Sequence, residues 1–180
     1  MKPLRNLALV ALFLTGSLAL AQDSLNVRRL GQLSDYWDVA YGVAVVDTLA
    51  YVATALTGLR IVNVADPAHP VEVGIYDTPG YAYGVAVAGN YAYVADGDGG
   101  LRVVDITNPA APFSAGICAT PGFARGVAVV GNYAYIADHA SGLRVVDITN
   151  PALPVEVGFY DTPGNALGVA VAGNYAYVAD

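Results

Sequence analysis

The stretch 142–180, GLRVVDITNPALPVEVGFYDTPGNALGVAVAGNYAYVAD, decides the fold because nearly the same sequence occurs earlier in the chain. Matching copies begin at Gly58 and Gly100, so the period is 42 residues (100 − 58 and 142 − 100), without a gap. Gly42 and Tyr51 keep the same frame further upstream. A repeat of this length is one supersecondary unit, and neighbouring copies stack to bury a common core.

Four short apolar runs lie within each copy and predict four strands. In the copy that begins at Gly100 the expected strands are 101–106, 113–118, 123–130 and 133–138. Turn residues such as Thr107-Asn108-Pro109 separate them, and no 3.6-residue apolar stripe with helix caps appears. The chain is therefore predicted to be all-β. Four strands in a repeat of this size are typical of a β-propeller blade, whereas the coils of a β-solenoid are usually shorter.

The run GVAV is expected to form the innermost strand of each blade, because small residues suit the point where blades converge. YAYVAD, LRVVD and VEVGFY then follow outward. The expected blades are 39–76, 81–118 and 123–160, with a partial blade at 165–180 and a lone outer strand at 25–33. Because this count leaves a blade edge open, we expect an incomplete ring that belongs to a longer propeller. The alternatives are a gapped four-bladed ring and an open arc that self-associates through its blade edges.

These 42-residue copies resemble the LVIVD repeat, which is found in β-propellers of bacterial and archaeal surface or secreted proteins. The resemblance is clear over 37–180 and loose over 25–36. It implies a propeller fold outside the cell, and it brings no catalytic motif.

Residues 1–21 have the features of a signal peptide: Lys2 and Arg5, an apolar run, and a small-residue cleavage site that ends at Ala21. The apolar run is shorter than the roughly 20 residues of a membrane span, so we expect a secreted or periplasmic protein with no span after cleavage. The formal net charge is −7, which becomes −9 without Lys2 and Arg5. So acidic a chain disfavours nucleic acid and anionic lipid as partners.

Most polar candidates have a simpler structural explanation. Arginines and aspartates that recur once per repeat are expected to tie strands and blades together: Arg60, Arg102, Arg144, Asp96, Asp138, Asp105 and Asp147. Asp96 and Asp98 form a weak calcium candidate in a glycine-rich turn, without the further acidic ligands of a calcium loop. His69 and His139 are expected to be exposed turn residues. Cys118, the single cysteine, is expected to be buried and not nucleophilic.

The residues that differ between copies are the informative ones for binding. The loops from the outer strand to the next inner strand, and from the second to the third strand, are expected to share one face. That face carries the candidate ligand-binding residues Trp37, Tyr41, Tyr81, Tyr83, Phe123, Arg125 and Asn165. Variable side chains on a rigid scaffold are a common source of specificity, and the aromatic share suits a carbohydrate or protein ligand. Drift in loops without a ligand explains the variation equally well.

We therefore expect a non-catalytic extracellular binding scaffold without a cofactor. A structural component of an envelope or extracellular layer is the alternative. A propeller enzyme is less favoured, because the predicted inner strands read GVAV and supply no catalytic side chain at the axis.

Overall fold

The computed structural model describes residues 38–180, which form strands arranged in four antiparallel sheets. Three sheets have four strands each, in sequential order, and the last has two. Blade 1 contains β1 (Ala40–Val46), β2 (Leu49–Thr54), β3 (Gly58–Asn63) and β4 (Val71–Tyr76). Blade 2 contains β5 (Gly84–Ala88), β6 (Tyr91–Ala95), β7 (Leu101–Asp105) and β8 (Phe113–Cys118). Blade 3 contains β9 (Gly126–Val130), β10 (Tyr133–Ala137), β11 (Leu143–Asp147) and β12 (Val155–Tyr160), and partial blade 4 contains β13 (Gly168–Ala172) and β14 (Tyr175–Ala179).

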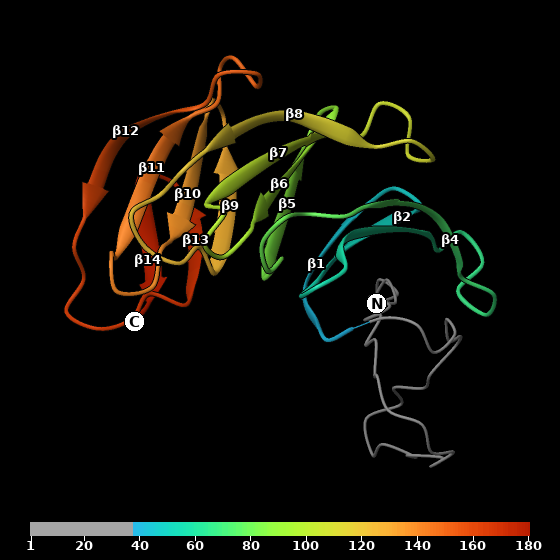
Figure 1. Cartoon of the computed structure of the whole chain (residues 1–180), viewed down its shortest axis with the longest axis horizontal. Helices are drawn as coiled ribbons and strands as arrows, with labels where there is room; N and C mark the ends of the chain where they lie inside the picture. Colours follow the sequence, from blue (N-terminus) through green and yellow to red (C-terminus); the bar gives the residue numbers. More distant parts are fainter. Residues whose placement is uncertain (1–37) are drawn as a thin grey trace, which may run out of the picture.

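The blades follow one another in an arc, from β1–β4 on the right of Figure 1 to β13 and β14 on the left. The first strands of successive blades, β1, β5, β9 and β13, are neighbours, so GVAV forms the inner strand as predicted. The all-β propeller prediction is confirmed.

One glycine per blade allows this convergence. A Cβ on Gly42 would lie 3.1 Å from the Cα of Gly84, and a Cβ on Gly84 would lie 3.1 Å from the Cα of Gly126. The same substitution at Gly126 would place a Cβ 3.0 Å from the Cα of Gly168. These four residues, named here the axis glycines, bring the inner strands to backbone contact at one end. A side chain on Gly42, Gly84 or Gly126 would push two blades apart.

The inner strands begin later than the sequence suggested. The strand expected at 123–130 starts at Gly126, because Ala124 is diverted into an isolated bridge with Gly97 of the preceding blade. The outer strand at Phe113–Cys118 has its predicted bounds.

The core lies between the blades and repeats with them. Leu59 and Ile61 of blade 1 pack with Val94 and Val104 of blade 2. The equivalent residues one repeat later, Leu101 and Val103, pack with Ile136 and Val146 of blade 3. A fully buried Leu or Ile side chain stabilises a fold by about 1.5–3 kcal/mol. Both faces of blade 2 are thus covered, which explains why its two middle strands are apolar on both sides.

Two predictions about the first part of the chain lie outside the described residues: the signal peptide at 1–21 and the lone outer strand at 25–33. Within 38–180 no helix is long and apolar enough to cross a membrane.

Replacing Gly84 with Val should destabilise the fold by about 1–3 kcal/mol, because overpacking at a tight contact forces the backbone to shift. The new Cβ would lie 3.0 Å from the carbonyl oxygen of Arg125 and 3.1 Å from the Cα of Gly126. Gly168 is the matched control, since a Cβ there would meet only the Cβ of Ala179, at 3.8 Å. Gly168→Val should change stability by about 0.5 kcal/mol or less. Urea unfolding of both variants measures the difference, and equal losses would contradict the role of the axis glycines.

Candidate ligand-binding face

Two kinds of loop meet at one end of the blades. Ala55, Gly97 and His139 follow the second strands of blades 1, 2 and 3, and each forms a bridge with an alanine that precedes the next blade. For His139 the partner is Ala166, with backbone nitrogen-to-oxygen distances of 3.0 Å in both directions. The predicted sharing of one face by these loops is therefore present in the structure. We name this end of the blades the loop face.

An aspartate that follows the second strand fastens the loop face within each of blades 2, 3 and 4, and it is buried in blades 2 and 3. Asp138 follows β10 and is fully buried. Its carboxylate accepts hydrogen bonds from Thr120 Oγ1 at 2.6 Å and from the Gly122 backbone nitrogen at 2.8 Å. Both donors belong to the Thr-Pro-Gly turn that leads into β9. The second strand of a blade thus holds the loop through which the chain enters that blade.

The same fastening recurs in the neighbouring repeats. Asp180 accepts the equivalent bonds from Thr162 and Gly164, at 2.6 and 2.8 Å. Asp96 accepts from Gly80 and from Arg102 Nε, each at 3.2 Å. The structural ties predicted for the repeated arginines and aspartates are therefore found for these residues. Asp105 and Asp147 act more locally, since each accepts a bond from the backbone nitrogen two residues later.

Directly before each axis glycine stands a residue that varies between blades. These mouth positions are Tyr41, Tyr83, Arg125 and Leu167. The axis glycines bring neighbouring strands to backbone contact. The side chains just before these glycines are therefore held close to one another. Tyr41 lies at a register shift between Ala40 and Gly42, and such bulges often redirect a side chain next to a functional site.

Three of the mouth positions, Tyr41, Tyr83 and Arg125, join an aromatic cluster that crosses three blades. The rings of Tyr41 and Tyr83 have centroids 4.8 Å apart, and those of Tyr83 and Phe123 are 5.4 Å apart. Tyr81 stacks on Tyr83 at 6.2 Å. The guanidinium of Arg125 lies 4.3 Å from the Tyr83 centroid and 5.1 Å from that of Phe123. Cation–π contacts of this kind hold an arginine in place at a partly exposed site.

The structure thus brings together five of the seven candidate residues: Tyr41, Tyr81, Tyr83, Phe123 and Arg125. Asn165 is exposed one repeat further along, at the position of Tyr81 and Phe123. Trp37 lies outside the described residues. Sequence reasoning did not identify Gly97 as part of this face. A Cβ on Gly97 would lie 2.9 Å from the Phe123 ring, so this glycine provides the space in which the ring rests.

The calcium candidate gains no further acidic ligand from the fold. Asp96 is buried and its Oδ2 is engaged by Arg102, whereas Asp98 is exposed. Residues 38–180 contain no cluster of three His, Cys, Asp or Glu side chains that would hold a metal ion.

The isolated histidines and the cysteine have local explanations. His69 is exposed, as predicted, and its Nδ1 lies 2.8 Å from Asp66 Oδ2. The prediction for His139 was wrong, because its backbone bridge to the next blade leaves it half-buried, with φ at +52°. Cys118 belongs to the core between blades 2 and 3. Burial raises the pKa of the Cys118 thiol, so little of the nucleophilic thiolate forms at neutral pH.

The pKa values of two aspartates are shifted in opposite directions. Burial raises the pKa of the Asp138 carboxyl above 3.8, although bonds from Thr120 and Gly122 oppose the shift. Hydrogen bonds from Thr149 hold the pKa of the half-buried Asp147 below 3.8. A raised folded-state pKa means that the stability contributed by Asp138 is fully present below about pH 3.8 and is lost as pH rises through the raised pKa.

Carbon-13 carboxyl titration by NMR should find Asp138 titrating at higher pH than Asp147. Thr120→Val removes a donor to the carboxylate and should raise the pKa of Asp138 further. If the measured pKa of Asp138 were equal to or lower than that of Asp147, burial would not be the dominant influence on the pKa of Asp138.

Comparison with known proteins identifies the repeat family and similar folds. The model of the LVIVD repeat matches four consecutive segments: 39–78, 79–120, 121–162 and 163–180. No curated protein matches the chain significantly. Among solved structures, the computationally designed Ika4 protein superposes with a TM-score of 0.66 at 10% identity, over 84% of this chain and 91% of that one. The computationally designed Ika8 protein gives 0.67 at 10% identity, over 84% of this chain and 46% of that one. At these identities the likeness concerns the fold alone.

Proposed function

Because the chain belongs to the LVIVD repeat family, we propose that it is a secreted or cell-surface β-propeller whose loop face binds an extracellular carbohydrate or protein. The observation that carries the proposal is the aromatic cluster at the mouth positions. Tyr41 is 55% exposed and Tyr81 is 43% exposed. Exposed rings supply large contact area at low cost in conformational entropy, and their hydroxyl groups add hydrogen bonds.

The way the cluster is held favours binding over loop drift. Tyr83 and Phe123 are half-buried and contact Arg125, so three residues from two blades fix one another. The loops beneath them are pinned by backbone bridges and by Asp138. A platform that is rigid before binding loses little entropy when a ligand arrives.

The signal-peptide features of residues 1–21 support export of the protein.

The enzyme alternative remains less favoured. The inner strands β1, β5, β9 and β13 carry only Gly, Ala, Val and Tyr41. None of these strands brings a carboxylate, histidine or lysine to the axis for acid–base chemistry.

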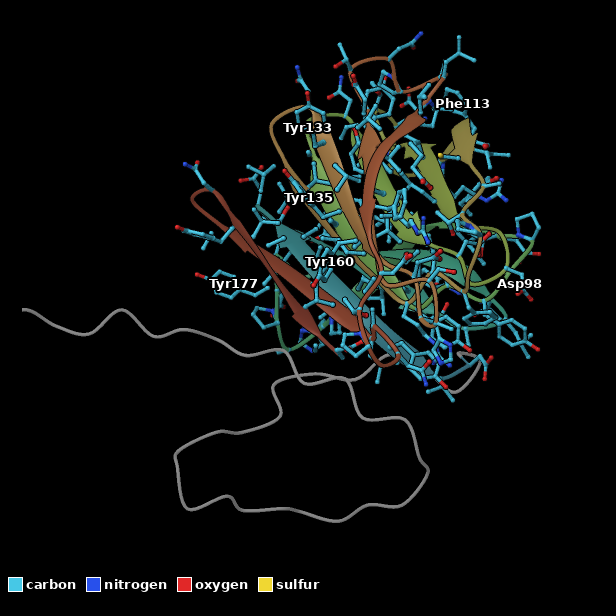
Figure 2. The ribbon with its side chains drawn as sticks, turned by 90° about the vertical axis from the view of Figure 1, so that its left-hand side faces the viewer. Asp98, Phe113, Tyr133, Tyr135, Tyr160 and Tyr177 are labelled. Carbon is cyan, nitrogen blue, oxygen red and sulfur yellow. The ribbon has the colours of Figure 1, made fainter. Side chains whose placement is uncertain are left out.

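Replacing Tyr81, Phe123 and Arg125 together with Ala should abolish retention of the protein on the surface of the cells that secrete it. Each change removes contact area from the loop face. The matched control replaces Phe113, Tyr133 and Leu153, which are exposed apolar residues of the other end. Figure 2 shows Phe113 and Tyr133 at the opposite end of the blades from Asp98, which belongs to the loop face.

Both triple variants need circular dichroism and thermal unfolding to confirm that they fold. Retention that survives the loop-face variant, or that falls equally in the control, would count against the loop face as the binding surface.

Self-association is a second candidate, favoured by the exposed edge of blade 4. Within the described chain β14 pairs only with β13, and its Tyr175 and Tyr177 are 70% and 59% exposed. Tyr93, the counterpart of Tyr177 in blade 2, is 3% exposed because blade 3 covers it. An open edge beside apolar side chains is suited to pairing with another strand. Such contacts would suit a component of an extracellular layer.

Sedimentation velocity at increasing protein concentration tests this second candidate. The unmodified chain should show a growing dimer fraction, and Tyr177→Lys should abolish the dimer, because a charge at an edge opposes pairing. Phe113→Lys, at an exposed position of comparable apolar character, is the control. A chain that stays monomeric at every concentration would exclude the second candidate without affecting the first.

A further inference from the structure

Arg125 differs from every other arginine that the structure describes. Arg60 pairs with Glu72, Arg102 pairs with Asp96, and Arg144 pairs with three acidic groups, Asp138, Glu156 and Asp161. Arg125 forms no ion pair among residues 38–180. Its buried Nε has no hydrogen-bond partner there, a feature that it shares with the Nε atoms of Arg60 and Arg144. It is the one cation of the described chain without a carboxylate, in a protein of formal net charge −7.

The guanidinium is nevertheless fixed in place. Tyr83 and Phe123 lie 4.3 and 5.1 Å from it, and the backbone nitrogen of Arg125 donates a bond to Ala137 at 2.8 Å. A cation–π contact attracts the charge of the guanidinium and uses none of its N–H groups as hydrogen-bond donors to a carboxylate. Those donors match the two oxygens of a carboxylate. An arginine held this way is prepared for an anionic group from outside the chain.

The surroundings limit what kind of anion fits. Among residues 38–180, Arg125 does not belong to a basic patch, and Asp98 is exposed on the same face. A polyanion such as nucleic acid would be repelled by the acidic chain and would find only one unpaired arginine among the described residues. An otherwise neutral molecule with a single carboxylate carries only one negative charge, so the acidic chain repels it much less than a polyanion.

The backbone of the loop face argues for a sugar over a peptide. A peptide that binds as an extended strand needs free main-chain partners. Here the loops have their groups paired with each other: Gly97 with Ala124, and His139 with Ala166. What the face offers is aromatic rings, tyrosine hydroxyls and one guanidinium. The apolar side of a sugar ring stacks on such rings, and its hydroxyl groups bond to tyrosine.

We infer that the loop face recognises a uronic acid unit of an otherwise neutral oligosaccharide, with its carboxylate on Arg125 and its ring on Tyr41 or Tyr81. This inference rests on the proposed function and adds the class of ligand. No covalent step is involved.

The repeats supply a variant that removes the charge and suits the fold. Leu167 occupies the mouth position of blade 4. Arg125→Leu therefore gives blade 3 a residue that the chain already has at the equivalent position. Circular dichroism and thermal unfolding confirm that the variant folds. The probe is a xylo-oligosaccharide with one glucuronic acid, compared with the same compound after reduction of its carboxyl group to an alcohol.

Calorimetric titration of the unmodified chain should give at least tenfold tighter binding of the acid than of its reduced form. Arg125→Leu should bind the acid only as weakly as the unmodified chain binds the reduced form. Raising the salt concentration from 50 to 500 mM should weaken binding of the acid and leave the reduced form unaffected, because the difference is electrostatic.

Equal affinity for the two compounds, or an acid affinity that Arg125→Leu leaves unchanged, would overturn the inference while leaving a sugar-binding face in place. No binding of either compound would overturn it as well. The cell-retention experiment is independent of these sugars, so its failure would reject the proposed function and not merely the class of ligand.

Discussion

The close approach of the inner strands at the axis glycines is the constraint from which the rest of the structure follows. Backbone contact between Gly42, Gly84, Gly126 and Gly168 fixes how near successive blades can stand. That spacing lets the faces of blades 1, 2 and 3 bury the apolar clusters between them. It also brings together the residues just before each glycine. The tyrosine pair 4.8 Å apart and the arginine above Tyr83 result from packing that is set by residues with no side chain.

The loop face combines a constant part with a variable part. Its constant part is polar: Asp138 and its counterparts hold the Thr-Pro-Gly turns, and paired backbone groups join one blade to the next. Its variable part consists of the side chains at the mouth and beside it. Because the backbone ties do not use these side chains, a change of residue there alters the surface and leaves the support intact.

The sequence predicted the features that repeat and missed those that depend on contact between repeats. The period, the four strands per blade and the inner place of GVAV were predicted from spacing and residue size, and the structure agrees with each. The late start of β9 and the half-buried His139 were not predicted, because both follow from hydrogen bonds between blades. The residues of the loop face were predicted from their variation. That Arg125 rests between Tyr83 and Phe123 was not predictable, since side chains 42 residues apart meet only once the angle between blades is known.

The mouth positions also suggest how proteins built from this repeat change over evolutionary time. Each 42-residue unit contributes one residue to the mouth, here Tyr, Tyr, Arg and Leu. Duplication of a unit would therefore add one mouth position together with the glycine that supports it. Exchange of units between related genes would reorder those positions without a new backbone. In such a lineage, the chemistry of the mouth can diversify faster than the architecture that carries it.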